Sequence, residues 1–300
     1  MNERRALGFG LAAVLLWSTV ATAFKLTLAE FSPIQMLTIA SIVSSIALIA
    51  VCAFQGKLSQ LSTTFLSNPW YYLLLGLVNP LAYYLILFKA YDLLPASQAQ
   101  AINYSWAITL TLMAAVFLGQ KIRKQDWIAC PFSYAGVVVI ATRGAVTSLS
   151  FSDPLGVAFA LGSTLVWASY WIIATRDTRD PVVGLFLNFL FGLPFITLAC
   201  WYTVGLELPL GRSLTAAVYV GVFEMGIAFV LWSQAMKKAE NTAKVSNLIF
   251  ISPFLSLVFI YFILGETIMP STYVGLTLIM AGLWLQQQKV RVRQRGLDHG

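Results

Sequence analysis

One acidic residue stands in the middle of a long apolar stretch, where a charge is expensive. Glu224 follows Arg212 by twelve residues and precedes Lys237 by thirteen, and no other charged residue lies between these two bases. A charge at the centre of a membrane helix costs about 2.5–3.5 kcal/mol on insertion scales, so Glu224 should face a cavity or a polar partner. We predict that it binds and releases protons as a coupling group; the alternative is a protonated acid hydrogen-bonded between helices.

Two polar residues of an earlier apolar stretch can point into the same space. Asn79 precedes Pro80, whose missing N–H and bulky ring free a backbone carbonyl of the helix. Tyr83 follows Asn79 by one helical turn and shares its face. We expect both side chains to hydrogen-bond a ligand, and a simple packing kink at the proline is the alternative.

A stripe of two amides and an indole occupies one face of the next apolar stretch. Gln100, Asn103 and Trp106 are spaced three residues apart, and such a stripe would be unfavourable against hydrocarbon. It either lines a transport pathway, which we favour, or joins helices through amide hydrogen bonds. Asn247 and Ser252, which directly precedes a proline, are the comparable polar residues later in the chain.

Two tryptophans lie well inside apolar stretches rather than at their ends, where interfacial anchors belong. They are Trp17 and Trp167. We expect them to form walls of a cavity, because an indole face can stack on an aromatic or cationic ligand. Simple packing against neighbouring helices is an equal alternative.

Residues for other chemistries are missing from the apolar stretches. Cys52, Cys130 and Cys200 form no CxxC pair, and the only histidine, His299, lies in the C-terminal tail. We therefore expect no metal site, no cofactor and no histidine proton relay. Catalysis would need paired acids, a His–Glu cluster or a nucleophile with a base, so we name no catalytic residue and disfavour an intramembrane enzyme.

The residues described above lie within long segments of the chain that carry almost no charge. The 300 residues are 59% hydrophobic and only 10% charged, whereas soluble domains are about 25% charged. A bilayer core needs a helix of about 20 apolar residues with its backbone hydrogen bonds satisfied internally. This predicts an all-α integral membrane protein with ten transmembrane helices, within intervals that contain no charged residue other than Glu224: 6–24, 31–56, 58–88, 93–120, 127–142, 154–175, 181–206, 213–236, 245–265 and 267–288.

The basic residues are distributed unevenly between the two faces that ten spans create. Fifteen of the nineteen Lys and Arg residues fall on the face that carries both termini. The positive-inside rule then places both termini in the cytoplasm. This distribution accounts for the net charge of +7 without a nucleic-acid partner.

The second half of the chain repeats features of the first at an offset of about 145 residues. A first repeat over 6–142 and a second over 154–288 precede a basic cytoplasmic tail, 289–300. Five helices per repeat is an odd number, so the repeats must be inverted, and inverted repeats commonly enclose a central cavity with alternating access. The matching landmarks are Trp17 with Trp167, 88–90 with 233–235, 118–120 with 264–266, Gly136 with Gly282, and Asn79 with Glu224.

The stretch 244–285 resembles the EamA-type ten-helix members of the drug/metabolite transporter superfamily. It contains the mid-helix Ser252-Pro253, then Leu264-Gly265-Glu266, then Gly275 and Gly282. The first repeat departs from this pattern, with Trp106-Ala107 where the proline would stand and Gln120 in place of the glutamate.

Two further segments resemble the aromatic amino acid exporter branch of that superfamily. They are 79–84, Asn-Pro-Leu-Ala-Tyr-Tyr, and 94–98, Leu-Pro-Ala-Ser-Gln. The resemblance implies a cavity lined by the first, third, fourth, sixth, eighth and ninth helices. It also implies a multi-pass protein of the bacterial inner (plasma) membrane.

These observations predict a secondary transporter that moves a small polar metabolite, most simply an amino acid, by alternating access. Outward transport and an aromatic amino acid as the substrate are what the resemblance implies. Its partners would be the small-molecule substrate and the lipid bilayer, and both a monomer and a homodimer remain open. A nucleotide-sugar or phosphorylated-metabolite antiporter is the alternative, but it would need basic residues in the cavity, and none lies within a span. No Walker motif is present, which disfavours ATP-driven pumping.

Overall fold

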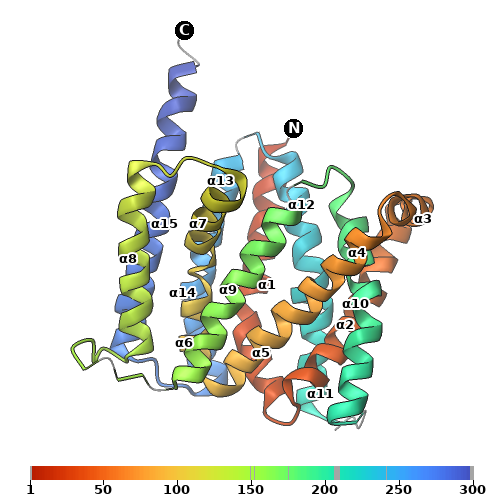
Figure 1. Cartoon of the computed structure of the whole chain (residues 1–300), viewed down its shortest axis with the longest axis horizontal. Helices are drawn as coiled ribbons and strands as arrows, with labels where there is room; N and C mark the ends of the chain where they lie inside the picture. Colours follow the sequence, from red (N-terminus) through yellow and green to blue (C-terminus); the bar gives the residue numbers. More distant parts are fainter. Residues whose placement is uncertain are drawn as a thin grey trace.

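The computed structural model describes residues 2–148, 150–151, 153–174, 176–205, 210–240 and 242–297 as a bundle of helices, with no strand in these segments (Figure 1). The elements are α1 (Glu3–Leu28), α2 (Pro33–Phe54), α3 (Leu58–Ser67), α4 (Pro69–Gly76), η1 (Leu77–Ala82), α5 (Tyr83–Leu93), α6 (Ala96–Asn103), α7 (Trp106–Leu118), α8 (Lys124–Ala141), α9 (Pro154–Ala174), α10 (Pro181–Thr203), α11 (Arg212–Tyr219), η2 (Val220–Ile227), α12 (Ala228–Lys238), α13 (Thr242–Ser246), η3 (Asn247–Ile251), α14 (Ser252–Phe259), η4 (Ile260–Leu264) and α15 (Pro270–Leu297).

Eight helical segments of the described chain are long and apolar enough to cross a membrane. Several of them begin where proline takes the first helical position, a place where its missing N–H costs nothing, as at Pro33, Pro69 and Pro181. The eight segments are Glu3–Leu28, Pro33–Phe54, Pro69–Leu93, Ala96–Leu118, Pro154–Ala174, Pro181–Thr203, Arg212–Lys238 and Lys244–Leu264.

The fifth and tenth predicted spans are also helices, α8 and α15, but they are not among these eight. They run side by side at one edge of the bundle and form its most extensive helix pair (Figure 1). The backbones touch at Gly136 and Gly275, where a Cβ on either residue would meet the carbonyl oxygen of the other. Small residues at a helix interface permit this close approach.

The third predicted interval, 58–88, is not a single helix, and we correct its boundaries. α3 covers its first part, has no buried residue and lies at the edge of the bundle (Figure 1). Asn68 breaks the helix with an extended backbone, and its side chain then caps the helix that starts at Pro69. The apolar interval therefore contains a surface helix followed by a span that continues to Leu93.

Four of the long segments are interrupted by irregular backbone. The backbone of Asn79 in η1 is non-helical, with φ −142° and ψ 111°. A turn at Tyr104 and Ser105 separates α6 from α7. η2 is a π-helix between α11 and α12, and η3 is a 3₁₀ helix before α14. Such irregular backbone is tolerated at membrane depth only where it is buried in protein or lines a cavity.

The first and last helices determine where the two ends of the described chain lie. α1 begins and α15 ends at the same end of the bundle, at the top of Figure 1. Residues 289–297 of the predicted tail continue α15 as helix, while residues 298–300, which include His299, lie outside the described residues.

Candidate functional site

A cavity of about 360 Å³ lies at the centre of the bundle. Its volume is within the range of small-molecule sites, about 300–1,000 Å³. The side chains around it come from α1, α5, α6, α7, α9, η2, α12, α13, η3 and α15. The lining therefore includes the six helices that the family resemblance implies, and it adds α15.

Trp167 of α9 is the centre of one aromatic wall. Tyr83 stacks on it with ring centroids 4.4 Å apart, and Tyr170 stacks at 5.3 Å. Trp106 and Phe229 meet the same indole at 6.4 and 6.0 Å. Aromatic pairs at these distances contribute about 0.5–1.5 kcal/mol each beyond their buried area, so this wall is held rigidly.

Trp17 of α1 forms a second aromatic wall. Its ring packs edge-on to Phe229 at 5.7 Å and lies 5.4 Å from Trp232. Phe229 thus connects the two tryptophans that the sequence repeat relates, Trp17 and Trp167. The cavity is consequently enclosed by flat apolar faces suited to an aromatic or other planar apolar group.

Glu224 places a carboxyl group in this aromatic surrounding. It belongs to the π-helix η2, is buried and lines the cavity. The hydroxyl of Tyr84 lies beside the carboxyl group. The π-helical turn packs tightly on α2, where the Ser44 hydroxyl donates to the Met225 carbonyl at 2.9 Å.

The two amides of α6 line the cavity, and one of them also joins two helices. Asn103 Nδ2 donates to Ser163 Oγ of α9 at 3.0 Å, and the same amide lies beside Tyr83. The Gln100 amide lies beside the Tyr104 hydroxyl. All of these except Ser163 line the cavity, as does Trp106.

Three of the predicted pathway residues lie outside the cavity wall. The non-helical backbone at Asn79 sends its side chain into the protein, where the amide lies beside Tyr170, and it is 1% exposed. Ser252 is fully buried and accepts a hydrogen bond from Ser18 at 3.3 Å. Asn247 begins η3 and does not line the cavity. The offset that paired Asn79 with Glu224 therefore does not give them equivalent surroundings.

The described lining contains a single charged side chain, Glu224, and no lysine, arginine or histidine. Among the described residues, no group of three or more His, Cys, Asp and Glu side chains could hold a metal ion. The cavity can accordingly offer one carboxyl group, several amides and hydroxyls, and aromatic faces.

The family model of EamA-like transporters matches residues 4–142 and 154–286. The chain belongs to the EamA-like transporter family. The resemblance inferred from 244–285 is thereby confirmed, and the chain is a multi-pass membrane protein of a transporter family rather than an enzyme family.

Several curated EamA-like relatives align over most of the chain. The aromatic amino acid exporter YddG of Ancylobacter novellus is 24% identical over 80% of this chain and 82% of its own length. The uncharacterized transporter YvbV of Bacillus subtilis is 23% identical over 94% and 91%. A probable terminal-alkyne amino-acid exporter of Streptantibioticus cattleyicolor is 24% identical over 67% of each chain. A crystal structure 22% identical to this chain shares its fold, with a TM-score of 0.66 over 97% of this chain and 99% of the other.

Several residues that line the cavity were not predicted from the sequence of this EamA-like protein. Tyr91, Trp171 and Trp232 are aromatic residues near predicted span ends, where an interfacial belt accounts equally well for such residues. Gln286 comes from α15 and reaches the cavity wall, where its amide contacts the Thr111 hydroxyl at 3.3 Å. The signal in the sequence for Gln286 was a polar residue inside the last predicted span, close to its end.

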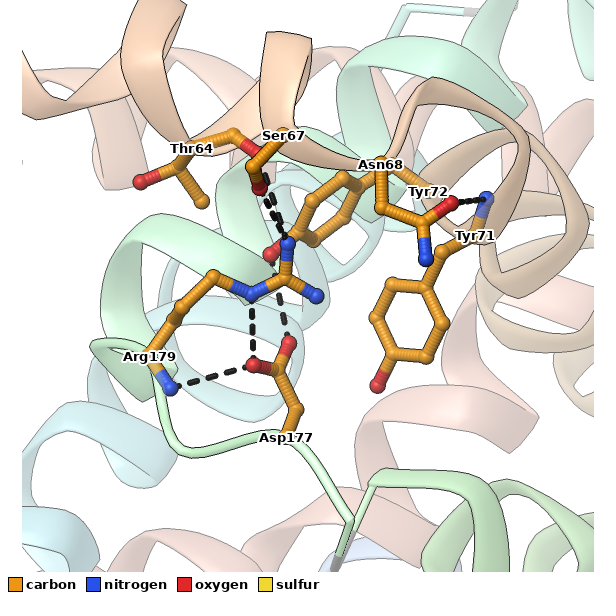
Figure 2. Close-up of polar contacts among 7 residues, drawn as sticks. All are labelled: Thr64, Ser67, Asn68, Tyr71, Tyr72, Asp177 and Arg179. Carbon is orange, nitrogen blue, oxygen red and sulfur yellow. Dashed lines mark hydrogen bonds and ion pairs between the residues drawn. The ribbon is translucent and has the colours of Figure 1, made fainter.

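A polar cluster lies outside the cavity at the end of the bundle that carries the chain termini (Figure 2). Arg179 Nε donates to Asp177 Oδ1 at 2.6 Å, and its Nη1 donates to Ser67 Oγ at 2.6 Å. The guanidinium also lies over the rings of Tyr71 and Tyr72, at 5.1 and 4.8 Å. Burial disfavours ionisation of Asp177, but the hydrogen bonds from Arg179 outweigh it, so the pKa of this carboxyl lies below its ordinary value.

Proposed function

We propose that this EamA-like protein is a secondary transporter that exports a small amino-bearing metabolite, most simply an amino acid with an aromatic or apolar side chain, by alternating access. The observation that carries the proposal is a 360 Å³ cavity between membrane-spanning helices, walled by tryptophan and tyrosine rings and containing one carboxyl group. Two relatives are named as amino acid exporters, which supports the same substrate class.

We assign roles to the lining residues on this basis. The rings around Trp167 and Trp17 stack on the apolar part of the substrate. The carboxyl group of Glu224 receives the substrate ammonium group and gives it up when a proton binds instead, which couples export to proton entry. Gln100 and Asn103 offer amide hydrogen bonds to the remaining polar groups of the substrate.

The proposed architecture is ten transmembrane helices in two inverted five-helix repeats, over 6–142 and 154–288, with the basic tail 289–300. The family model matches twice, which supports a duplicated unit. α8 and α15 pair along their length and are candidates for the two further spans, and the two ends of the described chain lie at the same end of the bundle, as an even number of spans would require. The excess of basic residues on that face and the bacterial relatives support an inner-membrane protein with cytoplasmic termini.

Reconstituted vesicles test the proposal. Purified protein in proteoliposomes should transport radiolabelled tryptophan or phenylalanine faster when a proton gradient is imposed. Glu224→Gln should bind substrate more weakly and lose the response to the gradient. Glu30→Gln, an acid in the connection between α1 and α2, is the matched control and should behave as wild type. Equal gradient-driven flux in wild type and Glu224→Gln would remove the coupling role.

The same assay addresses the antiporter alternative. A phosphorylated substrate would bring two or more negative charges into a lining whose only charged side chain is an acid. Burying such charges without a cationic partner is strongly unfavourable. We therefore expect no counterflow with a sugar phosphate or a nucleotide sugar, and robust counterflow with either would replace the amino acid proposal.

A further inference from the structure

The two ends of α1 contact two sharp corners of the chain at opposite ends of the bundle (Figure 1). The α5–α6 corner is Leu94 and Pro95, between the end of α5 and the start of α6. The α12–α13 corner is Ala239 and Glu240, after α12. Shifted by the repeat offset of 145 residues, Leu94 corresponds to Ala239, so the corners occupy equivalent places in the two halves.

The α5–α6 corner is held by two charges of opposite sign. The ammonium group of Lys25, from α1, donates to the carbonyls of Tyr91 and Leu94 at 2.7 and 2.9 Å. The carboxylate of Glu266, which follows η4, accepts from the N–H groups of Ala96 and Ser97 at 2.8 and 3.0 Å. A cation therefore sits at the carboxyl end of one helix and an anion at the amino end of the next, as the helix dipoles favour.

The α12–α13 corner has a similar but weaker connection to the other end of α1. The N–H of Asn2 donates to the Lys238 carbonyl at 3.2 Å, and the N–H of Glu240 donates to Glu3 at 2.9 Å. Glu3 also pairs with Lys244 at 3.7 Å, and the Lys244 side chain is 61% exposed. Exposed pairs of this kind contribute little.

The repeat explains why the two corners differ. Glu266 of the second repeat corresponds to Gln120 of the first, as the matched segments 118–120 and 264–266 show. A neutral amide lacks the negative charge that the amino end of a helix favours. The α5–α6 corner thus receives its acid from the segment after η4, whereas the α12–α13 corner receives its acid, Glu3, from the start of α1.

The cavity is sealed at the corner with the stronger connection. Phe24 packs on Phe88 and Tyr91 with ring centroids 4.8 and 5.0 Å apart, and all three side chains are buried. At the other end, the lining residues Trp232 and Ser246 are partly exposed. The sealed end and the doubly charged corner coincide.

We propose that Lys25 and Glu266 form the latch of the gate at the α5–α6 end of the cavity, and that this latch sets the resting conformation in favour of opening toward the α12–α13 end. Lys25 lies on α1, which also contacts the opposite corner, so a movement of α1 that releases one corner is transmitted to the other. The inference rests on the proposed alternating access, but it concerns conformation and can be tested without a substrate.

Thiol labelling from each side of the membrane tests the latch. Leu87→Cys reports on the sealed end of the cavity, and the native cysteines are buried and give the background. With the latch intact, a membrane-impermeant maleimide applied from the α5–α6 side should label this position slowly. Glu266→Gln should raise that rate about tenfold, the equivalent of 1.4 kcal/mol. In the same background, Ser246→Cys should be labelled more slowly from the opposite side.

Two further variants separate the latch from simpler explanations. Glu3→Gln removes an acid at the other corner and should not raise the Leu87→Cys rate. The exchange Lys25→Glu with Glu266→Lys keeps one charge of each sign but puts each at the wrong helix end, so labelling should stay fast. Wild-type labelling in Glu266→Gln, with an unaltered melting temperature, would overturn the proposal, and so would recovery by the exchange. Transport of amino acids is measured separately, so failure of the latch and failure of the proposed function are distinguishable.

Discussion

Arg179 provides a sharp test of whether the polar cluster of Figure 2 stabilises the fold through geometry or through charge alone. Its guanidinium reaches Asp177 and Ser67 at the same time and covers two tyrosine rings. In Arg179→Lys the positive charge remains, but a single ammonium group cannot keep all of these contacts. Arginine and lysine are not interchangeable at such a site.

The expected loss follows from these contacts. A hydrogen bond from a charged donor contributes about 1.5–3 kcal/mol when buried, and a cation–π contact contributes about 0.5–1 kcal/mol at exposed sites. The Arg179 side chain is 27% exposed and that of Asp177 is 15% exposed, so solvent reduces the first figure. Losing the Ser67 bond and the ring contacts should destabilise the protein by about 2 kcal/mol. That corresponds to a fall of roughly 4–8 °C in melting temperature, using the scale for domains of 150–250 residues.

Thermal unfolding of purified protein in one detergent measures this effect. Arg176→Lys is the matched control, because this arginine lies three residues earlier in the same connection and is exposed. It should change the melting temperature by less than about 1 °C, as surface substitutions usually do. If Arg179→Lys were as stable as Arg176→Lys, charge alone would account for the cluster and the geometric reasoning would be refuted.

Three other changes follow from the structure. The pKa of Asp177 in the folded protein lies below the ordinary value of 3.8, so the ionised carboxylate stabilises the fold above that value. Lowering the pH through the folded-state pKa should remove this stability, and the melting temperature should therefore fall below about pH 4. Asp177→Asn should flatten this part of the profile. Gly136→Val should separate α8 from α15 and lower the melting temperature by several degrees, whereas Gly8→Val, where a Cβ meets nothing within 4 Å, should not. Trp167→Ala should weaken binding of tryptophan about tenfold in a competition assay. Trp284→Ala, on the exposed face of α15, should leave this binding unchanged. Equal affinities in these two variants would argue against the stacking role.

The positions of most spans could be predicted from where charged residues stop. Lipid tolerates few charges, so the uncharged intervals and the helical segments agree closely at 31–56 and 181–206, where the structure has Pro33–Phe54 and Pro181–Thr203. The agreement fails at 58–88, because absence of charge does not distinguish a surface helix from a span. α3 is uncharged but contains enough serine, threonine and glutamine to remain exposed.

The cavity residues were recognised where a polar or aromatic side chain stood deep in an apolar segment. Glu224, Asn103 and Trp167 fit this rule and line the cavity. Asn79 fits it equally well but lies outside the wall, because its own backbone leaves the helix and redirects the side chain. Sequence spacing gives a face only while the helix is regular, so a residue at an interruption cannot be placed by counting.

The interruptions themselves depend on neighbours that are remote in sequence. The π-helix that carries Glu224 lies against α2, where the Ser44 hydroxyl binds the Met225 carbonyl across 181 positions of the chain. Gly221 approaches the Ala40 carbonyl so closely that a side chain would not fit. A π turn inserts an extra residue into the helix and therefore changes the direction in which the following side chains point. The orientation of Glu224 and Phe229 toward the same cavity therefore depends on the packing of α2 as well as on the residues that line the cavity.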